Sequence, residues 1–137
     1  MILKKAQVSV EYILIALGVV VMLSIITLSV INIYSKNTTA IDNSSLKSTS
    51  DKLQEFFNIC ELQPNFKNTI IFNTYSDWKL RNNGVHSVIL SNNNKKYIIT
   101  TKDSVLLTTK YLTKNKKYNL IIKKSNNKIT ISIEENK

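Results

Sequence analysis

The chain has 137 residues, 43% of them hydrophobic, and a formal net charge of +10. Its single cysteine, Cys60, and single histidine, His86, exclude an intrachain disulfide and a cysteine–histidine metal cluster, so we expect no metal and no cofactor. No phosphate-binding loop and no nucleophile-elbow motif occurs in the sequence. The composition therefore predicts no catalytic residue and disfavours an enzyme.

The first predicted element is a long apolar helix. No charged residue occurs from Tyr12 to Ser35, and Ile13–Ile31 is apolar except for one glycine and three hydroxyl residues. As a helix this run rises roughly 28 Å, close to a hydrocarbon core of about 30 Å. The run exceeds the apolar part of a cleavable secretory signal, about 7–15 residues, so a signal anchor fits better. Lys4 and Lys5 precede it and predict a cytoplasmic N-terminus.

Glu11 lies at the start of this apolar run, where a plain membrane anchor gains nothing from a carboxylate. An acidic side chain within a membrane helix costs roughly 2.5–3.5 kcal/mol at the bilayer centre and less near an end. One interpretation places Glu11 at the interface among lipid headgroups, with Tyr12 beside it as an interfacial aromatic residue. The other interpretation is that Glu11 has a partner on another molecule.

The stretch "KKAQVSVEY" resembles the class III signal peptide of archaeal type IV pilins. The pattern of that family is a short basic leader followed by Q-x-S-x-E and an aromatic or apolar residue. Here the pattern is formed by Gln7, Ser9, Glu11 and Tyr12. The resemblance covers about Lys4 to Ile33, and the β head predicted at 64–137 does not contribute to it. It implies that Ser9 is a recognition residue for the processing peptidase.

The resemblance also implies a cleavage site and an assembly contact. A prepilin peptidase would remove the leader, with Lys4 and Lys5, by cutting between Ala6 and Gln7 on the cytoplasmic side. Gln7 would then be the first residue and Glu11 the fifth, the position at which type IV pilins carry a carboxylate. In the family this carboxylate pairs with the N-terminal amine of a neighbouring subunit. Such a contact would set the register between subunits, because an unpaired charge in apolar surroundings is costly.

The partners implied by the resemblance are the prepilin peptidase, other copies of this chain or related pilins in a helical filament, the pilus assembly platform, and the membrane before assembly. The implied location is a single-pass membrane precursor with the head outside the cell, and then an extracellular surface filament. Nucleic acid is disfavoured as a partner, because lysine far outnumbers the single arginine, Arg81. Proteins that read phosphates or bases usually rely on arginine.

The helix is predicted to continue to Gln63, because Pro64 cannot continue it. The polar stretch Asn37–Ser50 has low helix propensity and predicts a kink or a frayed turn. Beyond it, apolar residues recur at spacings of three and four, which predicts a helix face that packs on a sheet. This stripe consists of Leu53, Phe56, Phe57 and Cys60.

Two N-glycosylation sequons begin at Asn37 and Asn43, where the helix would leave the membrane on its outer side. Their number is no signal by itself, because the chain is rich in asparagine, serine and threonine. We therefore treat Asn37 and Asn43 as candidate glycosylation sites on the basis of their location.

After Pro64 the hydrophobic period changes to two. Six segments rich in Ile, Val, Thr and Tyr predict short strands, at residues 68–75, 84–91, 95–101, 104–112, 116–124 and 127–135. The tight polar connections between them predict an antiparallel meander. Within the last segment, alternation predicts that Ile129, Ile131 and Ile133 share one face. Trp78 and Phe66 are expected to cover the open end of the sheet or its junction with the helix.

The predicted fold class is α+β, with a long, pilin-like N-terminal hydrophobic helix that carries a small antiparallel β-sheet head. The predicted domains are a cleaved leader at 1–6, a membrane or filament-core helix at 7–36, its amphipathic continuation at 37–63, and the β head at 64–137. The leading hypothesis is a structural pilin. The alternative is a signal-anchored surface protein whose basic extracellular head binds a ligand, an anionic surface or DNA.

Overall fold

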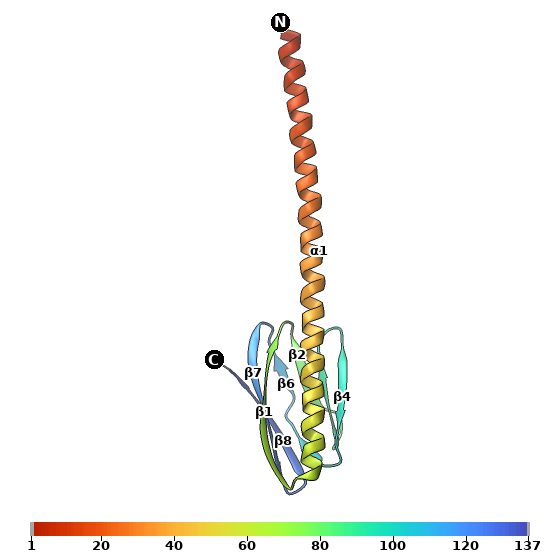
Figure 1. Cartoon of the computed structure of the whole chain (residues 1–137), viewed down its shortest axis with the longest axis vertical. Coiled ribbons are helices and arrows are strands. Elements are labelled where there is room, and N and C mark those ends of the chain that lie inside the picture. Colours follow the sequence, from red (N-terminus) through yellow and green to blue (C-terminus); the bar gives the residue numbers. More distant parts are fainter. Residues whose placement is uncertain (1, 137) are drawn as a thin grey trace. The chain divides into compact units, whose positions relative to one another are not determined.

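The computed structural model describes the backbone of residues 2–136 and the side chains of residues 7–136. A single helix, α1 (Ile2–Leu62), precedes eight strands in this part of the chain (Figure 1). The strands are β1 (Asn65–Thr74), β2 (Trp78–Asn82), β3 (Ser87–Ser91), β4 (Lys96–Thr100), β5 (Ser104–Leu106), β6 (Lys110–Leu112), β7 (Lys116–Ser125) and β8 (Lys128–Glu135). The chain divides into two compact units, Met1–Asn37 and Thr38–Lys137, and each contains part of α1.

The predicted frayed turn at Asn37–Ser50 is wrong, because α1 passes through this stretch without a break. Packing accounts for the difference: Leu46 is fully buried in the core. The hydroxyl of Thr49 donates to the backbone carbonyl of Ser45 at 2.9 Å, which keeps a buried polar group satisfied within the helix. Tertiary contacts thus override a weak local propensity.

The strands form two sheets, and the predicted single meander of six strands is wrong. The sheet orders are β1-β7-β8-β5 and β4-β3-β2-β6. Sequence reasoning missed β2, whose sequence WKLRN carries two charged residues, and it joined β5 and β6, which belong to different sheets. All strand pairs are antiparallel except β5 with β8, which is parallel. The antiparallel pairing of β1 with β7 joins segments that are distant in sequence, which local turn signals cannot reveal.

The apolar stripe of α1 packs on the sheets as predicted. Leu53, Phe57 and Cys60 are fully buried. Phe56 lies at the border of this stripe, where it is half-buried, and its ring contacts the ring of Phe66 edge-on at a centroid distance of 5.7 Å. Phe66 therefore covers the junction between helix and sheet.

Of the two expected positions for Trp78, the structure supports the junction with the helix, because Trp78 is only 2% exposed and its indole donates to Asp42 of α1. Its ring stacks on Phe72 at 5.4 Å, and Phe72 in turn packs against Tyr118 at 6.0 Å. The predicted alternation in β8 is confirmed, since Ile129 and Ile131 are buried and Ile133 packs against the same core.

Asp42 connects α1 to the strands and the turns between them through five hydrogen bonds. Its Oδ1 accepts from the backbone N–H groups of Tyr75 and Ser76, both at 3.1 Å, and from the Trp78 indole at 2.8 Å. Its Oδ2 accepts from the Ser76 hydroxyl and from the Asn92 amide, both at 2.6 Å. Burial raises the pKa of Asp42, but these hydrogen bonds outweigh burial and hold its pKa below the ordinary value.

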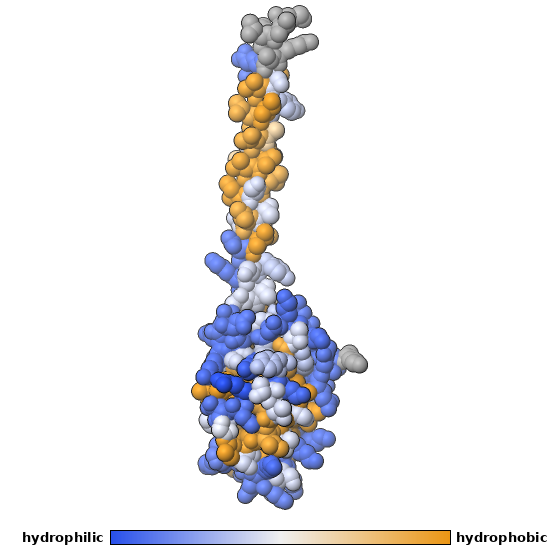
Figure 2. Space-filling model, turned by 180° about the vertical axis from the view of Figure 1, so that it is seen from behind, coloured by the Kyte–Doolittle hydropathy of each residue, from blue (hydrophilic) through white to orange (hydrophobic). Residues whose placement is uncertain are grey.

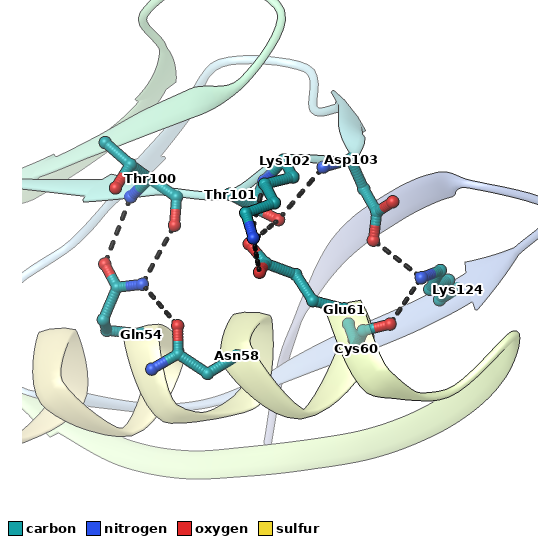
Figure 3. Close-up of polar contacts among 9 residues, drawn as sticks. All are labelled: Gln54, Asn58, Cys60, Glu61, Thr100, Thr101, Lys102, Asp103 and Lys124. Atoms are coloured by element: carbon teal, nitrogen blue, oxygen red, sulfur yellow. Dashed lines mark hydrogen bonds and ion pairs between the residues drawn. The ribbon is translucent and has the colours of Figure 1, made fainter.

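Further along α1, polar side chains bind the edge strand β4 and the residues that follow it (Figure 3). The Gln54 amide accepts from the backbone N–H of Thr100 at 3.1 Å and donates to its carbonyl at 2.9 Å. Glu61 accepts from the backbone N–H of Lys102 at 2.9 Å. Because Thr100 lies in the edge strand β4, Gln54 satisfies backbone groups that an unpaired edge would expose.

Lys124 extends from β7 to the C-terminal end of α1 (Figure 3). Its side chain is 4% exposed, and its Nζ lies 2.7 Å from Asp103 Oδ2 and donates to the backbone carbonyl of Cys60. A cation at this position complements the unpaired carbonyls and the negative end of the helix dipole.

Burial also raises the pKa of the Cys60 thiol, more than Lys124 lowers it. Such a thiol is a core residue rather than a reactive one, which disfavours an intermolecular disulfide.

We expect a fragment spanning 38–137 to unfold cooperatively, with Phe57 as a major contributor to its core. Phe57→Ala should lower the free energy of unfolding by about 3–5 kcal/mol, because it removes a fully buried ring. Phe56→Ala is the matched control and should have a smaller effect, because this ring is only half-buried. Urea denaturation of the wild-type fragment and of the two variants measures both effects. Equal losses of unfolding free energy in the two variants would contradict the placement of Phe57 in the core and Phe56 at its border.

Asp42 gives the fragment a specific pH dependence. A carboxylate with a lowered folded-state pKa stabilises the fold above its unfolded pKa, about 3.9, and this stabilisation disappears as the pH falls through the lower folded value. Asp42→Asn should therefore cost about 1–3 kcal/mol at neutral pH and much less in strong acid. Urea denaturation from pH 7 to pH 2 tests this, with exposed Asp51→Asn as control. A constant difference between wild type and Asp42→Asn would contradict it.

Candidate processing and assembly segment

The residues of the Q-x-S-x-E pattern all lie on α1 within the unit Met1–Asn37, and all are exposed. Gln7 and Glu11 are one helical turn apart and share a face, whereas Ser9 points to a different side. Among the residues whose side chains the structure describes, the ion pairs do not involve Glu11. Its carboxylate is therefore available to a partner outside the described part of the chain.

The leader residues Lys4, Lys5 and Ala6 have side chains outside the described set, and only their helical backbone is described. The bond between Ala6 and Gln7 thus lies within α1. The predicted roles of these residues in cleavage stay predictions.

The apolar run that follows is left uncovered by the described residues. Within α1 an 18-residue window has a mean hydropathy of 2.8, and 0% of it is buried. By length and composition this helix can cross a membrane. Figure 2 shows hydrophobic side chains along the visible face of this run. An exposed apolar surface of this extent indicates contact with lipid or with other protein.

Three hydroxyl residues interrupt this apolar surface, but their polar groups are satisfied internally. The hydroxyls of Ser24, Thr27 and Ser29 donate to the backbone carbonyls four residues earlier, at 2.8, 2.8 and 2.9 Å. An unsatisfied polar group in hydrocarbon costs several kcal/mol, and this bonding removes that cost. Sequence reasoning treated these residues only as interruptions, although serine and threonine commonly bond in this way within helices.

The candidate glycosylation sites differ in their surroundings. Asn37 is exposed, whereas Asn43 is half-buried, and its side-chain oxygen accepts from the Asn92 amide at 3.0 Å. Both residues lie on α1 rather than in a loop. Glycosylation at either site stays a prediction, and Asn43 would have to give up its contact with Asn92.

The described residues contain no group of three or more metal-binding side chains. His86 Nδ1 lies 3.0 Å from the backbone carbonyl oxygen of Asp103, which is a structural contact rather than part of a catalytic constellation.

Comparison with protein families gives one match, in which residues 4–29 fit the class III signal peptide. This match indicates a type IV pilin-like substrate of a prepilin peptidase, synthesised as a membrane-anchored secreted precursor that takes part in pilus assembly. The class consists of structural, pilin-type proteins rather than enzymes. The match does not assign roles to Gln7, Ser9, Glu11 or Tyr12. Comparisons with curated proteins and with solved structures give no match.

Processing can be tested on the protein isolated from cells. We expect the mature chain to begin at Gln7. Lys5→Glu and Gln7→Ala should each reduce cleavage without unfolding the strands, which lie more than 50 residues further along the sequence. N-terminal mass spectrometry measures the start of the chain, and circular dichroism of the purified variants monitors the fold. An intact Met1, or a cut after the apolar run, would contradict this prediction.

Proposed function

We propose that this protein is a structural subunit of an archaeal type IV pilus-like surface filament. A prepilin peptidase cuts it between Ala6 and Gln7, and it assembles through the apolar part of α1. The observation that carries the proposal is the coincidence of a class III signal peptide with an apolar helix that its own chain leaves uncovered. The membrane covers this helix before assembly, and neighbouring subunits cover it afterwards.

The membrane stage follows from the helix itself. Ile13–Ile31 is long enough to cross the hydrocarbon core, and the hydroxyls within it bond to the helix backbone. The precursor can therefore wait in the membrane without an unsatisfied polar group in this segment. Lys4 and Lys5 hold the leader on the cytoplasmic side, where the peptidase acts.

The assembly stage depends on Glu11. Cleavage exposes a new amine at Gln7, and the Glu11 carboxylate of an adjacent subunit is its complement in charge. Neither group has a favourable environment among apolar helices unless it finds the other, so a subunit docked out of register leaves both unpaired. The contact joins different surfaces of two identical chains, and such heterologous contacts build open helical filaments.

Replacement of Glu11 by glutamine tests this assembly contact. Glu11→Gln keeps the shape and removes the charge, so membrane insertion and cleavage should be retained while the yield of filaments falls sharply. The measurement compares mature protein in membranes with filaments sheared from cells that lack the native gene. Glu134→Gln, an exposed acid on β8, is the control and should leave assembly unchanged.

Normal filaments in normal amount from the Glu11→Gln strain would refute the pairing role. A membrane protein that begins at Gln7 but never enters the sheared fraction, even as wild type, would favour the alternative of a signal-anchored surface protein.

A further inference from the structure

The outer face of the sheet β1-β7-β8-β5 carries two lysines that lie opposite each other on neighbouring strands. Lys67 on β1 is the direct cross-strand partner of Lys123 on β7. Both side chains are exposed, and the ion pairs of the described residues involve neither of them. Like charges directly opposite each other destabilise a pair of strands. This lysine pair therefore weakens the isolated head.

A second like-charge pair, of opposite sign, lies on α1. Asp51 and Glu55 are one helical turn apart, and both are exposed. Like charges at this spacing destabilise a helix. Lys47 and Lys52 lie within a turn of them, but the ion pairs among the described side chains do not include these four residues. Within the described part of the chain, Asp51 and Glu55 therefore have lysines nearby but form no ion pair with them.

The two pairs lie on opposite layers of the unit Thr38–Lys137. Leu53 and Phe57 face the strands, so Asp51 and Glu55 lie on the solvent side of α1. In β1 the buried residues alternate with the exposed series that includes Lys67, which places the lysine pair on the face turned away from the core. Figure 1 shows α1 in front of the strands, and Figure 2 shows the reverse side, where hydrophilic side chains cover much of the surface.

The net charge of the second unit favours an assembly contact that brings opposite charges together. Of the 19 basic residues only Lys4, Lys5 and Lys36 precede the second unit, and of the 9 acidic residues only Glu11 does. This unit is therefore strongly cationic, and closely packed copies repel one another. A contact that places an acidic pair against a basic pair replaces two internal repulsions with an attraction between copies.

We propose that in the filament the Lys67–Lys123 pair of one head docks against the Asp51–Glu55 pair on α1 of a second copy. This inference rests on the proposed function, because it assigns a contact between the second units (Thr38–Lys137) of two copies in the assembled filament. Since the two surfaces are different and lie on opposite layers, each copy keeps one of them free for a further copy. The contact therefore extends along a chain of subunits instead of closing a dimer.

Charge reversal of the full-length protein tests the contact in cells that lack the native gene. Lys67→Glu/Lys123→Glu and Asp51→Lys/Glu55→Lys should each abolish sheared filaments, because each places like charges across the contact. The combination of all four substitutions should restore filaments, since it exchanges the two partners. Lys95→Glu/Lys96→Glu changes the net charge by the same amount as the first pair, away from the contact, and should leave filaments intact.

The outcomes separate the two proposals. If wild type forms filaments and each reversal also forms them normally, the contact between heads is refuted while the pilin function stands. Filaments that the fourfold variant fails to restore would likewise overturn the contact. If wild-type chains enter no filament at all, the proposed function fails, and the inference that rests on it fails as well.

Cross-linking gives a second readout that does not depend on filament yield. In the Glu55→Cys/Lys123→Cys variant, oxidation of surface filaments should produce a ladder of covalent multimers, because every copy contributes both surfaces. Each single variant should remain monomeric, since Cys60 is buried and unreactive. Monomers alone from the double variant, or dimers alone, would contradict a contact that propagates.

Discussion

The uncovered apolar surface of Ile13–Ile31 is the constraint on which the rest of the molecule depends. A helical segment of this hydropathy that the described residues leave unburied is unfavourable in water, so it requires lipid or other protein around it. The hydroxyls of Ser24, Thr27 and Ser29 adapt to either environment, because each bonds to the helix backbone. Glu11 is different, since in the proposed filament its carboxylate pairs with the N-terminal amine of a neighbouring subunit. In that proposal one segment accounts for both the membrane-bound precursor and the assembly with neighbours.

The second unit meets a different requirement, which is to hold the later part of α1 against two small sheets. Apolar burial supplies most of the attraction, through residues such as Leu53 and Phe57. Polar contacts fix the position of the helix: Asp42 binds the segment after β1, and Lys124 caps the last turn of α1. These contacts are directional, so they define where the helix lies along the strands more sharply than apolar packing does.

Much of this organisation could be predicted from the sequence, because it depends on local periodicity. The apolar run, the stripe ending at Cys60, and the alternation in β8 are read from spacings within a few residues. The helix ends at Leu62, as Pro64 requires. The signal peptide is also local, and the match of residues 4–29 to the class III signal peptide agrees with it.

The parts that could not be predicted depend on partners distant in sequence. The pairing of β1 with β7 and the parallel pairing of β5 with β8 are tertiary choices, and a meander is only the simplest arrangement of such strands. The polar stretch Asn37–Ser50 was misjudged for the same reason. Its low helix propensity is offset by the burial of Leu46 and by the hydrogen bonds of Asp42, whose partners are Tyr75, Ser76, Trp78 and Asn92. No local pattern marks such a network.

In the proposed function the apolar segment leaves the membrane and becomes the covered interior of a filament made of this chain. Helical reconstruction by electron cryomicroscopy of filaments sheared from cells tests it most directly. We expect chains that begin at Gln7, with Ile13–Ile31 enclosed by the same segment of neighbouring copies and the strands on the outside. Filaments without this chain, or a chain found only in the membrane with its apolar segment in contact with lipid, would contradict the account.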